Sequence, residues 1–139
     1  MIGIGQPFEL TKASQGTAEF YLKGNLIFKK NAHFGKDCLI YIGENATCEI
    51  GDLFAMGSRG KLLCYHNILF KDCVRIGFET QVIDTNFHKI IDLETNQIMP
   101  IVSKISIGNY NWIGNRSSIM QKTVTPNNCI IASNSLCNK

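Results

Sequence analysis

Aliphatic residues recur at every sixth position through much of the chain. The longest series lies toward the C-terminal end and consists of aliphatic, β-branched or small residues: Ile107, Ile113, Ile119, Thr125, Ile131 and Cys137. Glycine follows the first two members, and smaller residues such as Asn111 and Ser117 lie four positions after each member. A period of six fits neither the 3.6-residue repeat of an α-helix nor the two-residue alternation of an isolated strand.

The same spacing recurs upstream with small slips of frame. Two further series are Ile50, Met56, Leu62 and Ile68, and then Ile76, Val82 and His88. The frame slips by two residues where Phe-Gly or Ile-Gly pairs lie eight apart, at 34–35, 42–43 and 50–51, and again between Ile68 and Ile76. Such insertions fit corners that bulge outward.

A six-residue repeat predicts a triangular prism of short strands. One bulky aliphatic residue per side points to the axis, and three sides make a coil of about 18 residues. Successive coils stack through parallel β hydrogen bonds about 4.8 Å apart, so that identical positions form columns. We therefore expect an all-β fold, a parallel β-helix of hexapeptide repeats with very little helix, in a single domain over residues 1–139. Its handedness does not follow from the period.

The aliphatic ladder breaks directly after His88. The six-step spacing would put aliphatic residues at 94 and 100, but the chain has Glu94 and Pro100 there. The segment KIIDLETNQIMPIVSK therefore predicts one loop, over about 89–104, that extrudes from the prism. Long loops in compact domains are commonly functional.

Composition narrows the classes of function. Apolar residues make up 45% of the 139, enough for a core, and the net charge is only +3, with Lys29–Lys30 as the longest basic run. This pattern disfavours nucleic acid as a partner. No apolar run approaches the roughly 20 residues of a membrane span, and the N-terminus lacks the pattern of a signal peptide. The six cysteines form no CxxC pair, so we expect reduced thiols, no metal site and a cytoplasmic location.

The hexads and two longer stretches carry a resemblance to a known family. IGFETQVIDTNFH at 76–88 and ISIGNYNWIGNRSSIM at 105–120 resemble the hexapeptide-repeat acyltransferases, above all the bacterial sugar O-acetyltransferases of capsule, exopolysaccharide and lipopolysaccharide. The resemblance covers about residues 34–139. It implies a left-handed parallel β-helix that assembles as a homotrimer. It also implies acetyl-CoA as the acyl donor and a hydroxyl of a sugar or polysaccharide precursor as the acceptor.

The same resemblance implies that His88 is the catalytic base. Attack of an alcohol on a thioester requires removal of the hydroxyl proton, and imidazole is the side chain whose ordinary pKa lies nearest to neutral pH. In an extended segment Asp84 and Asn86 share one face with His88. The family more often has aspartate at the position of Asn86, so we expect Asp84 to be the catalytic carboxylate. The six-step series also allows the His88 ring to point inward, without a chemical role.

Further site residues follow from the resemblance. We expect Asn86, Lys89 and Trp112 to contact the acceptor sugar, although an outward aromatic residue at a trimer interface would explain Trp112 equally well. For CoA the resemblance points to the outer face of the last coils, where the candidates are Gly114, Ala132, Ser133 and Lys139. Small residues let pantetheine approach the backbone, and a lysine can meet a phosphate.

Other functions compete with O-acetylation. The same base would serve N-acetylation of an amino sugar or nucleotide-sugar. The chain ends at SLCNK, without the Gly-Asn-Pro-Ala-type element and terminal helix that cap CoA in the family. A chain truncated at the C-terminus, and so an inactive fragment or a non-catalytic β-helix scaffold, is therefore the second alternative. A metal-dependent lyase such as a carbonic anhydrase is disfavoured, because the spacing of His33, His66 and His88 does not fit whole coils of three hexads.

Overall fold

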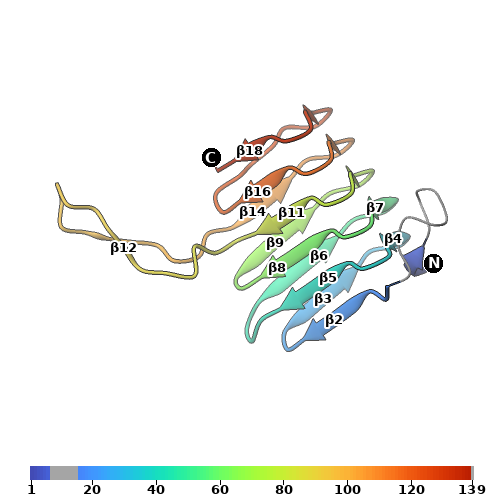
Figure 1. Ribbon diagram of the computed structural model, residues 1–139, viewed down its shortest axis with the longest axis horizontal. Coiled ribbons are helices and arrows are strands. Elements are labelled where there is room, and N and C mark those ends of the chain that lie inside the picture. The colour runs from blue at the N-terminus through green and yellow to red at the C-terminus, as the bar shows by residue number, and fades with distance from the viewer. Residues whose placement is uncertain (7–15, 139) are drawn as a thin grey trace.

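Parallel strands wind into a three-sided prism. The structure is a computed structural model that describes residues 1–6 and 16–138. Its strands alternate among three parallel sheets, faces A, B and C, and the strands of each face stack along one axis (Figure 1). Face A contains β1 (Ile2–Gln6), β4 (Ala32–Gly35), β7 (Phe54–Met56), β10 (Arg75–Ile76), β15 (Trp112–Ile113) and β17 (Ile130–Ile131). Face B contains β2 (Glu19–Leu22), β5 (Leu39–Ile42), β8 (Lys61–Cys64), β11 (Gln81–Ile83), β16 (Ser118–Met120) and β18 (Leu136–Cys137). Face C contains β3 (Asn25–Phe28), β6 (Thr47–Ile50), β9 (Asn67–Phe70) and β14 (Ile105–Ile107).

This arrangement confirms the predicted fold class. Strands that neighbour one another on a face pair in parallel, and no helix occurs among the described residues. The chain is an all-β, left-handed parallel β-helix. Nothing in the described part of the chain is a helix that could cross a membrane. We name each corner by the faces that it joins, so the BC corner leads from face B to face C.

The N-terminal coils are longer than the three hexads that the sequence period predicts. Ile40 pairs with Leu62, and Leu62 pairs with Val82, so the equivalent position on face B recurs only after more than three hexads in both coils. Toward the C-terminal end Ile113 pairs with Ile131, and the coil is three hexads long, as expected. The two-residue slips in the sequence account for the difference, because each slip lengthens one side of the prism.

Phenylalanine fills the wider coils. Phe34, Phe54 and Phe70 are fully buried, and the ring centroid of Phe54 lies 5.5 Å from that of Phe34 and 5.0 Å from that of Phe70. In the narrower C-terminal coil the interior is filled by Ile113 and Ile119, which are also fully buried. A longer coil encloses more volume, and protein interiors are packed with few voids, so the larger side chains lie where the sides are longer.

Polar side chains stack along the CA corner and hold the coils in register. The Asp52 carboxylate accepts a hydrogen bond from the Asn31 backbone N–H (3.1 Å), and the Asp72 carboxylate accepts one from the Asp52 N–H (2.8 Å). The Asn109 side-chain oxygen accepts from the Asp72 N–H (3.0 Å), and that of Asn127 accepts from the Asn109 N–H (2.9 Å). These bonds satisfy N–H groups that the turn would leave unpaired. The bond from Asn31 is the main reason that the pKa of the Asp52 carboxyl lies below its ordinary value.

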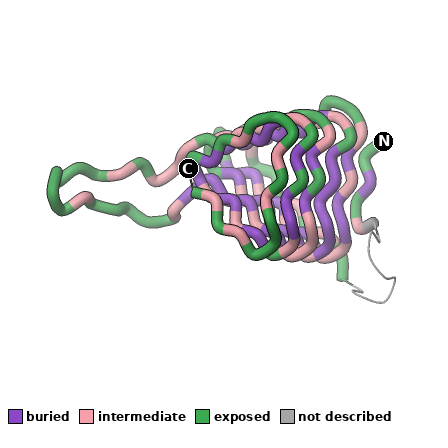
Figure 2. The backbone as a smooth tube through the Cα atoms, turned by 90° about the horizontal axis from the view of Figure 1, so that it is seen from above, coloured by how far each residue is buried: buried purple, intermediate pink, exposed green. Residues whose placement is uncertain are grey.

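One coil is interrupted at the BC corner by a β-hairpin, which we call the arm. After β11 the chain leaves the prism, and Thr85 pairs antiparallel with Val102. Farther out, β12 (Ile90–Ile91) pairs antiparallel with β13 (Ile98–Met99). Figures 1 and 2 show the arm projecting from the side of the prism, with most of its residues exposed.

The predicted loop over 89–104 is therefore present, but its start and its form differ from the expectation. Antiparallel pairing begins at Thr85, so His88 belongs to the arm and does not precede it. The segment is a regular hairpin and not an irregular loop. Sequence alone missed the hairpin because the aliphatic pairs that form it are short and separated by a polar turn.

Truncation of a core phenylalanine tests the wider coils. We expect Phe54→Ala to lower the free energy of unfolding by about 3–5 kcal/mol, because it leaves a cavity between two other rings. Urea denaturation followed by circular dichroism measures this change. Leu53→Ala is the matched control, because Leu53 is 46% exposed, and we expect a loss of roughly 0.5 kcal/mol. Equal losses for the two variants would show that the buried phenylalanine rings do not form the core of these coils.

Candidate functional site

Asp84 anchors the base of the arm. Its side chain is fully buried, and its carboxylate accepts hydrogen bonds from three successive backbone N–H groups of the coil beneath: Tyr65 at 2.7 Å, His66 at 2.8 Å and Asn67 at 2.9 Å. Consecutive N–H groups in a turn form a concave site for an anion. The carboxylate thus binds to the corner between β8 and β9, at the point where its own chain turns outward.

Two more contacts complete this anchor. The Cys64 thiol donates to Asp84 Oδ2 at 3.6 Å. Burial, followed by the negative charge of Asp84, raises the pKa of the Cys64 thiol to about 12, so the thiol stays protonated as a donor. Cys64 is one of six cysteines, all free. On the other side, the Asp84 carbonyl accepts the Ser103 N–H at 3.0 Å, which joins the outgoing and returning chains of the arm.

His88 lies outside the prism, close to the point where the arm leaves it. Its side chain is exposed, so it does not occupy the interior column that the six-step series allowed. Phe87, which precedes it, has a left-handed backbone with φ 61°, as Asn45 and Lys122 have at the BC corners of other coils. The Phe87 ring meets the Tyr65 ring edge-on at 5.4 Å. Among the residues that the structure describes, none forms a hydrogen bond with the His88 ring, which is therefore available to a ligand.

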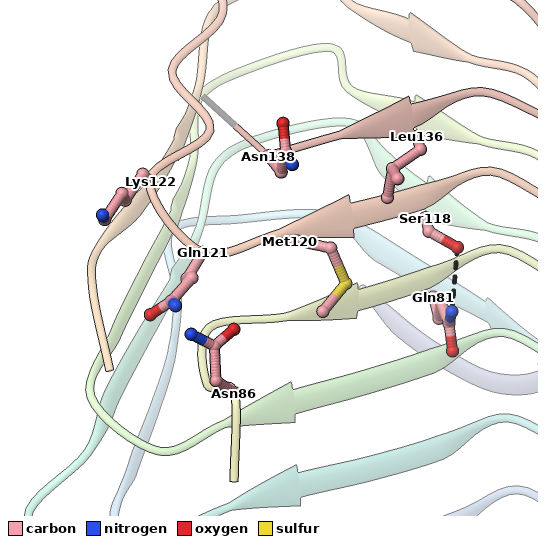
Figure 3. A pocket seen from close by; sticks show the side chains of 8 residues that line it. All are labelled: Gln81, Asn86, Ser118, Met120, Gln121, Lys122, Leu136 and Asn138. Carbon is pink, nitrogen blue, oxygen red and sulfur yellow. Dashed lines mark hydrogen bonds between the residues drawn. The ribbon is translucent and has the colours of Figure 1, made fainter. Parts of the chain in front are cut away.

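A polar cleft of about 420 Å³ lies beside the base of the arm, on face B. Its lining comes from the arm, from the strands β11, β16 and β18, and from the corner that follows β16 (Figure 3): Gln81, Asn86, Ser118, Met120, Gln121, Lys122, Leu136 and Asn138. Asn86, expected to contact the acceptor, is the lining residue nearest in sequence to His88. Cα atoms two residues apart are separated by at most about 7 Å, so the backbone of His88 lies close to the part of the cleft that Asn86 lines.

Sequence reasoning missed Gln121, although a signal for it exists. Residues two positions after an inward aliphatic residue of face B form their own buried column, in which Ile42 pairs with Cys64. The same column continues with Asp84 and Gln121, where an apolar residue would suit the core. A polar residue in an otherwise apolar column marks both the anchor and the cleft.

The other residues expected to bind the acceptor are not in this cleft. Lys89 is exposed on the arm. Trp112 lies on β15 of face A, where it pairs with Arg75, and is 57% exposed. Within one chain, face A is a different side of the prism from the BC corner that carries the arm.

The candidates for CoA lie at the AB corner. Ala132 and Ser133 are exposed there. A side chain at Gly114 would place its Cβ 2.5 Å from the Ser133 backbone nitrogen, so the glycine is required by the close stacking of two coils. The Ser133 hydroxyl oxygen accepts the Asn115 N–H at 3.1 Å. Lys139 lies outside the described residues.

Comparison with known proteins adds one structural likeness. No family model matches the chain, and no curated protein matches it. A crystal structure described as that of the polySia specific acetyltransferase NeuO is similar to this chain with a TM-score of 0.44 and 19% sequence identity. The similarity covers 82% of this chain and 68% of that one. At this level the likeness carries no argument, and the fold assignment rests on the strand pairing of the chain itself.

Removal of the buried anchor tests its role. We expect Asp84→Ala to lower the free energy of unfolding by on the order of 3 kcal/mol, because three N–H groups lose their acceptor. Hydrogen exchange should also speed up at the amides of Tyr65, His66 and Asn67. Asp92→Ala is the matched control: its carboxylate also accepts two backbone N–H groups, but in the turn of the arm, where water can replace it. If both variants behaved alike, the arm would not depend on the Asp84 contact.

Proposed function

We propose that the protein transfers an acetyl group from acetyl-CoA to a hydroxyl of a sugar or glycan precursor, with His88 as the general base. The observation that carries this proposal is an exposed imidazole, available to a ligand, at the base of the arm and beside a polar cleft. The motif around His88 resembles that of sugar O-acetyltransferases, and the chain leaves the prism next to it.

The chemistry requires one proton to move twice. A ring nitrogen of His88 takes the proton of the acceptor hydroxyl as its oxygen attacks the thioester carbonyl carbon. The tetrahedral oxyanion then collapses, the C–S bond breaks, and the imidazolium gives the proton to the CoA sulfur. The products are the O-acetylated sugar and free CoA, and no metal or redox partner is needed. Backbone N–H groups are the usual donors to such an oxyanion.

In this proposal Asp84 is a positioning residue. Both oxygens of its carboxylate accept hydrogen bonds inside the prism, so its contribution is to fix the point from which the arm departs and, with it, the place of His88. Asn86 contacts the acceptor directly from the cleft, and Lys89 offers a positive charge on the exposed surface of the arm. A general base that is held by a rigid element is already close to the position that the reaction requires.

The donor site is proposed at the AB corner of a neighbouring copy. Acetyl-CoA would lie along Gly114, Ala132 and Ser133, with Trp112 nearby on face A. In one chain this corner and the BC corner are separated by a full side of the prism. Contact between the AB corner of one copy and the arm of the next brings donor and base together, which supports a homotrimer with sites between its subunits.

The arm itself supports such an assembly. Four aliphatic side chains of this one short hairpin are exposed to solvent. Their exposed fractions are 48% for Ile90, 52% for Ile91, 62% for Ile98 and 93% for Leu93. Contiguous exposed apolar surface marks a site of interaction. A neighbouring subunit that covers the arm would bury these side chains and exclude water from the histidine.

Replacement of the base tests the reaction. We expect His88→Ala to lower kcat for thiol release from acetyl-CoA by about 10²–10⁴-fold with a sugar acceptor, because the hydroxyl proton then has no acceptor. His66→Ala, at the neighbouring part of the BC corner, is the control and should retain activity. Affinity for CoA, measured by calorimetry, should be unchanged in both variants.

The outcomes separate the competing functions. Wild-type protein that neither binds CoA nor releases thiol with any sugar is a scaffold or an inactive fragment, and the proposal fails. Activity that survives in His88→Ala contradicts the assignment of the base but leaves acyl transfer in place.

Mixing of variants tests the shared site. A His88→Ala chain lacks the base, and a Ser133→Trp chain has a blocked AB corner. If each site combines two subunits, refolding the two inactive variants together should restore about a quarter to a third of the activity, because some interfaces then join two intact halves. Light scattering should give the mass of a trimer. No recovery together with a monomeric mass would contradict the proposed assembly.

A further inference from the structure

The arm leaves one side chain of the next coil without a hydrogen bond. Ile83 pairs with Met120, so the residues that follow them, Asp84 and Gln121, occupy equivalent positions in successive coils. Asp84 meets three backbone N–H groups in the coil beneath it, whereas beneath Gln121 the chain has turned out into the arm. Gln121 is only 7% exposed, and its buried Oε1 makes no hydrogen bond within the described part of the chain.

This carboxamide faces a second one across the cleft. Figure 3 shows the side chains of Gln121 and Asn86 extending toward each other, while Lys122 points outward at the rim. Neither amide forms a side-chain hydrogen bond to another described residue. Buried polar groups without partners are rare in native proteins and call for an explanation, and a ligand that bonds to both amides supplies one.

The rest of the cleft suits the two kinds of surface on a sugar. Met120 and Leu136 provide apolar area for the C–H face of a pyranose ring. Asn138 adds a further amide, whereas the Gln81 amide already donates to the Ser118 hydroxyl at 2.8 Å. The cleft therefore offers both apolar area and hydrogen-bonding groups, the two kinds of contact that small-molecule sites combine.

Charge distinguishes between kinds of sugar. None of the eight lining residues carries a carboxylate, and the charged one among them is Lys122. A protonated amine would enter this cleft without a counter-charge and beside a positive one, which is unfavourable. A hydroxyl or an N-acyl group brings no charge, donates to the Gln121 oxygen and accepts from an amide N–H.

Resting on the acetyl transfer proposed above, we propose that this cleft seats the acceptor sugar and that the Gln121 carboxamide is its specificity-determining group. The site accepts hydroxyl and N-acyl groups and rejects a sugar with a protonated amine. Acetylation at oxygen, and not at the nitrogen of an amino sugar, follows from this preference.

Two matched acceptors and two substitutions test the proposal. Thiol release from acetyl-CoA is measured with methyl glycosides of N-acetylglucosamine and of glucosamine. The wild type should prefer the N-acetylated sugar. Gln121→Leu should raise its KM by about tenfold through the loss of hydrogen bonds, with kcat changed less than about threefold. Gln121→Glu should shift the kcat/KM ratio at least about tenfold toward glucosamine, because it adds the missing counter-charge.

The controls and the contrary outcomes are distinct from those of the proposed function. Asn25 is an exposed carboxamide on face C in the first coil, so Asn25→Leu and Asn25→Asp should change neither KM nor the preference. Saturation-transfer NMR with the two sugars, without acetyl-CoA, measures binding even if transfer is absent. A wild type that favours glucosamine, or Gln121 variants that bind and turn over both sugars as the wild type does, would overturn the proposal while leaving acetyl transfer intact.

Discussion

Every coil of this prism must satisfy its backbone through the coils on either side of it. Parallel pairing along three faces means that equivalent residues lie directly above one another, so a change in one coil has to be matched by its neighbours. The lengthened sides near the N-terminal end show the constraint. Where the coils exceed three hexads, the interior is wider, and the buried rings of Phe34, Phe54 and Phe70 help to fill it.

The arm is a local exception to that constraint, and the candidate site is its direct result. The arm replaces the BC corner of one coil, and two polar residues in the same column differ in the partners that they find. Asp84 still has a coil beneath it and is fully satisfied, whereas Gln121 lies above the departure point and is not. A single excursion of the chain thus creates a rigid anchor, an exposed histidine and a cleft with unpaired amides.

The sequence predicted the prism well because its signal is repeated many times. Each hexad states the same preference, and errors at single positions do not change the period. Ser117, one of the smaller residues that lie four positions after a repeat residue, is fully buried. The site is harder to predict, because each of its residues occurs once. His88 fits the six-step series as well as a motif, and only the backbone beyond Thr85 shows that its ring lies outside.

The roles of Asp84 and Gln121 could not be predicted from the sequence, for a related reason. A carboxylate four residues before a histidine suggests a pair, but the number of free N–H groups at the corner below depends on three-dimensional stacking. The hairpin form of the arm and the separation of Trp112 from the BC corner likewise follow from which face each strand joins, which the period of six leaves undetermined.

The ladder of aspartate and asparagine side chains along the CA corner crosses the interrupted coil without a break, since Asp72 bonds directly to Asn109, thirty-seven positions farther along the chain. The hydrogen bonds of the CA corner therefore do not depend on the number of residues in the arm. Such a scaffold can exchange one protruding hairpin for another of different size or chemistry while the winding of the main axis continues undisturbed. A change in the ligand or partner that this surface binds would then require replacement of the hairpin at a single junction. The interior of the prism would stay the same.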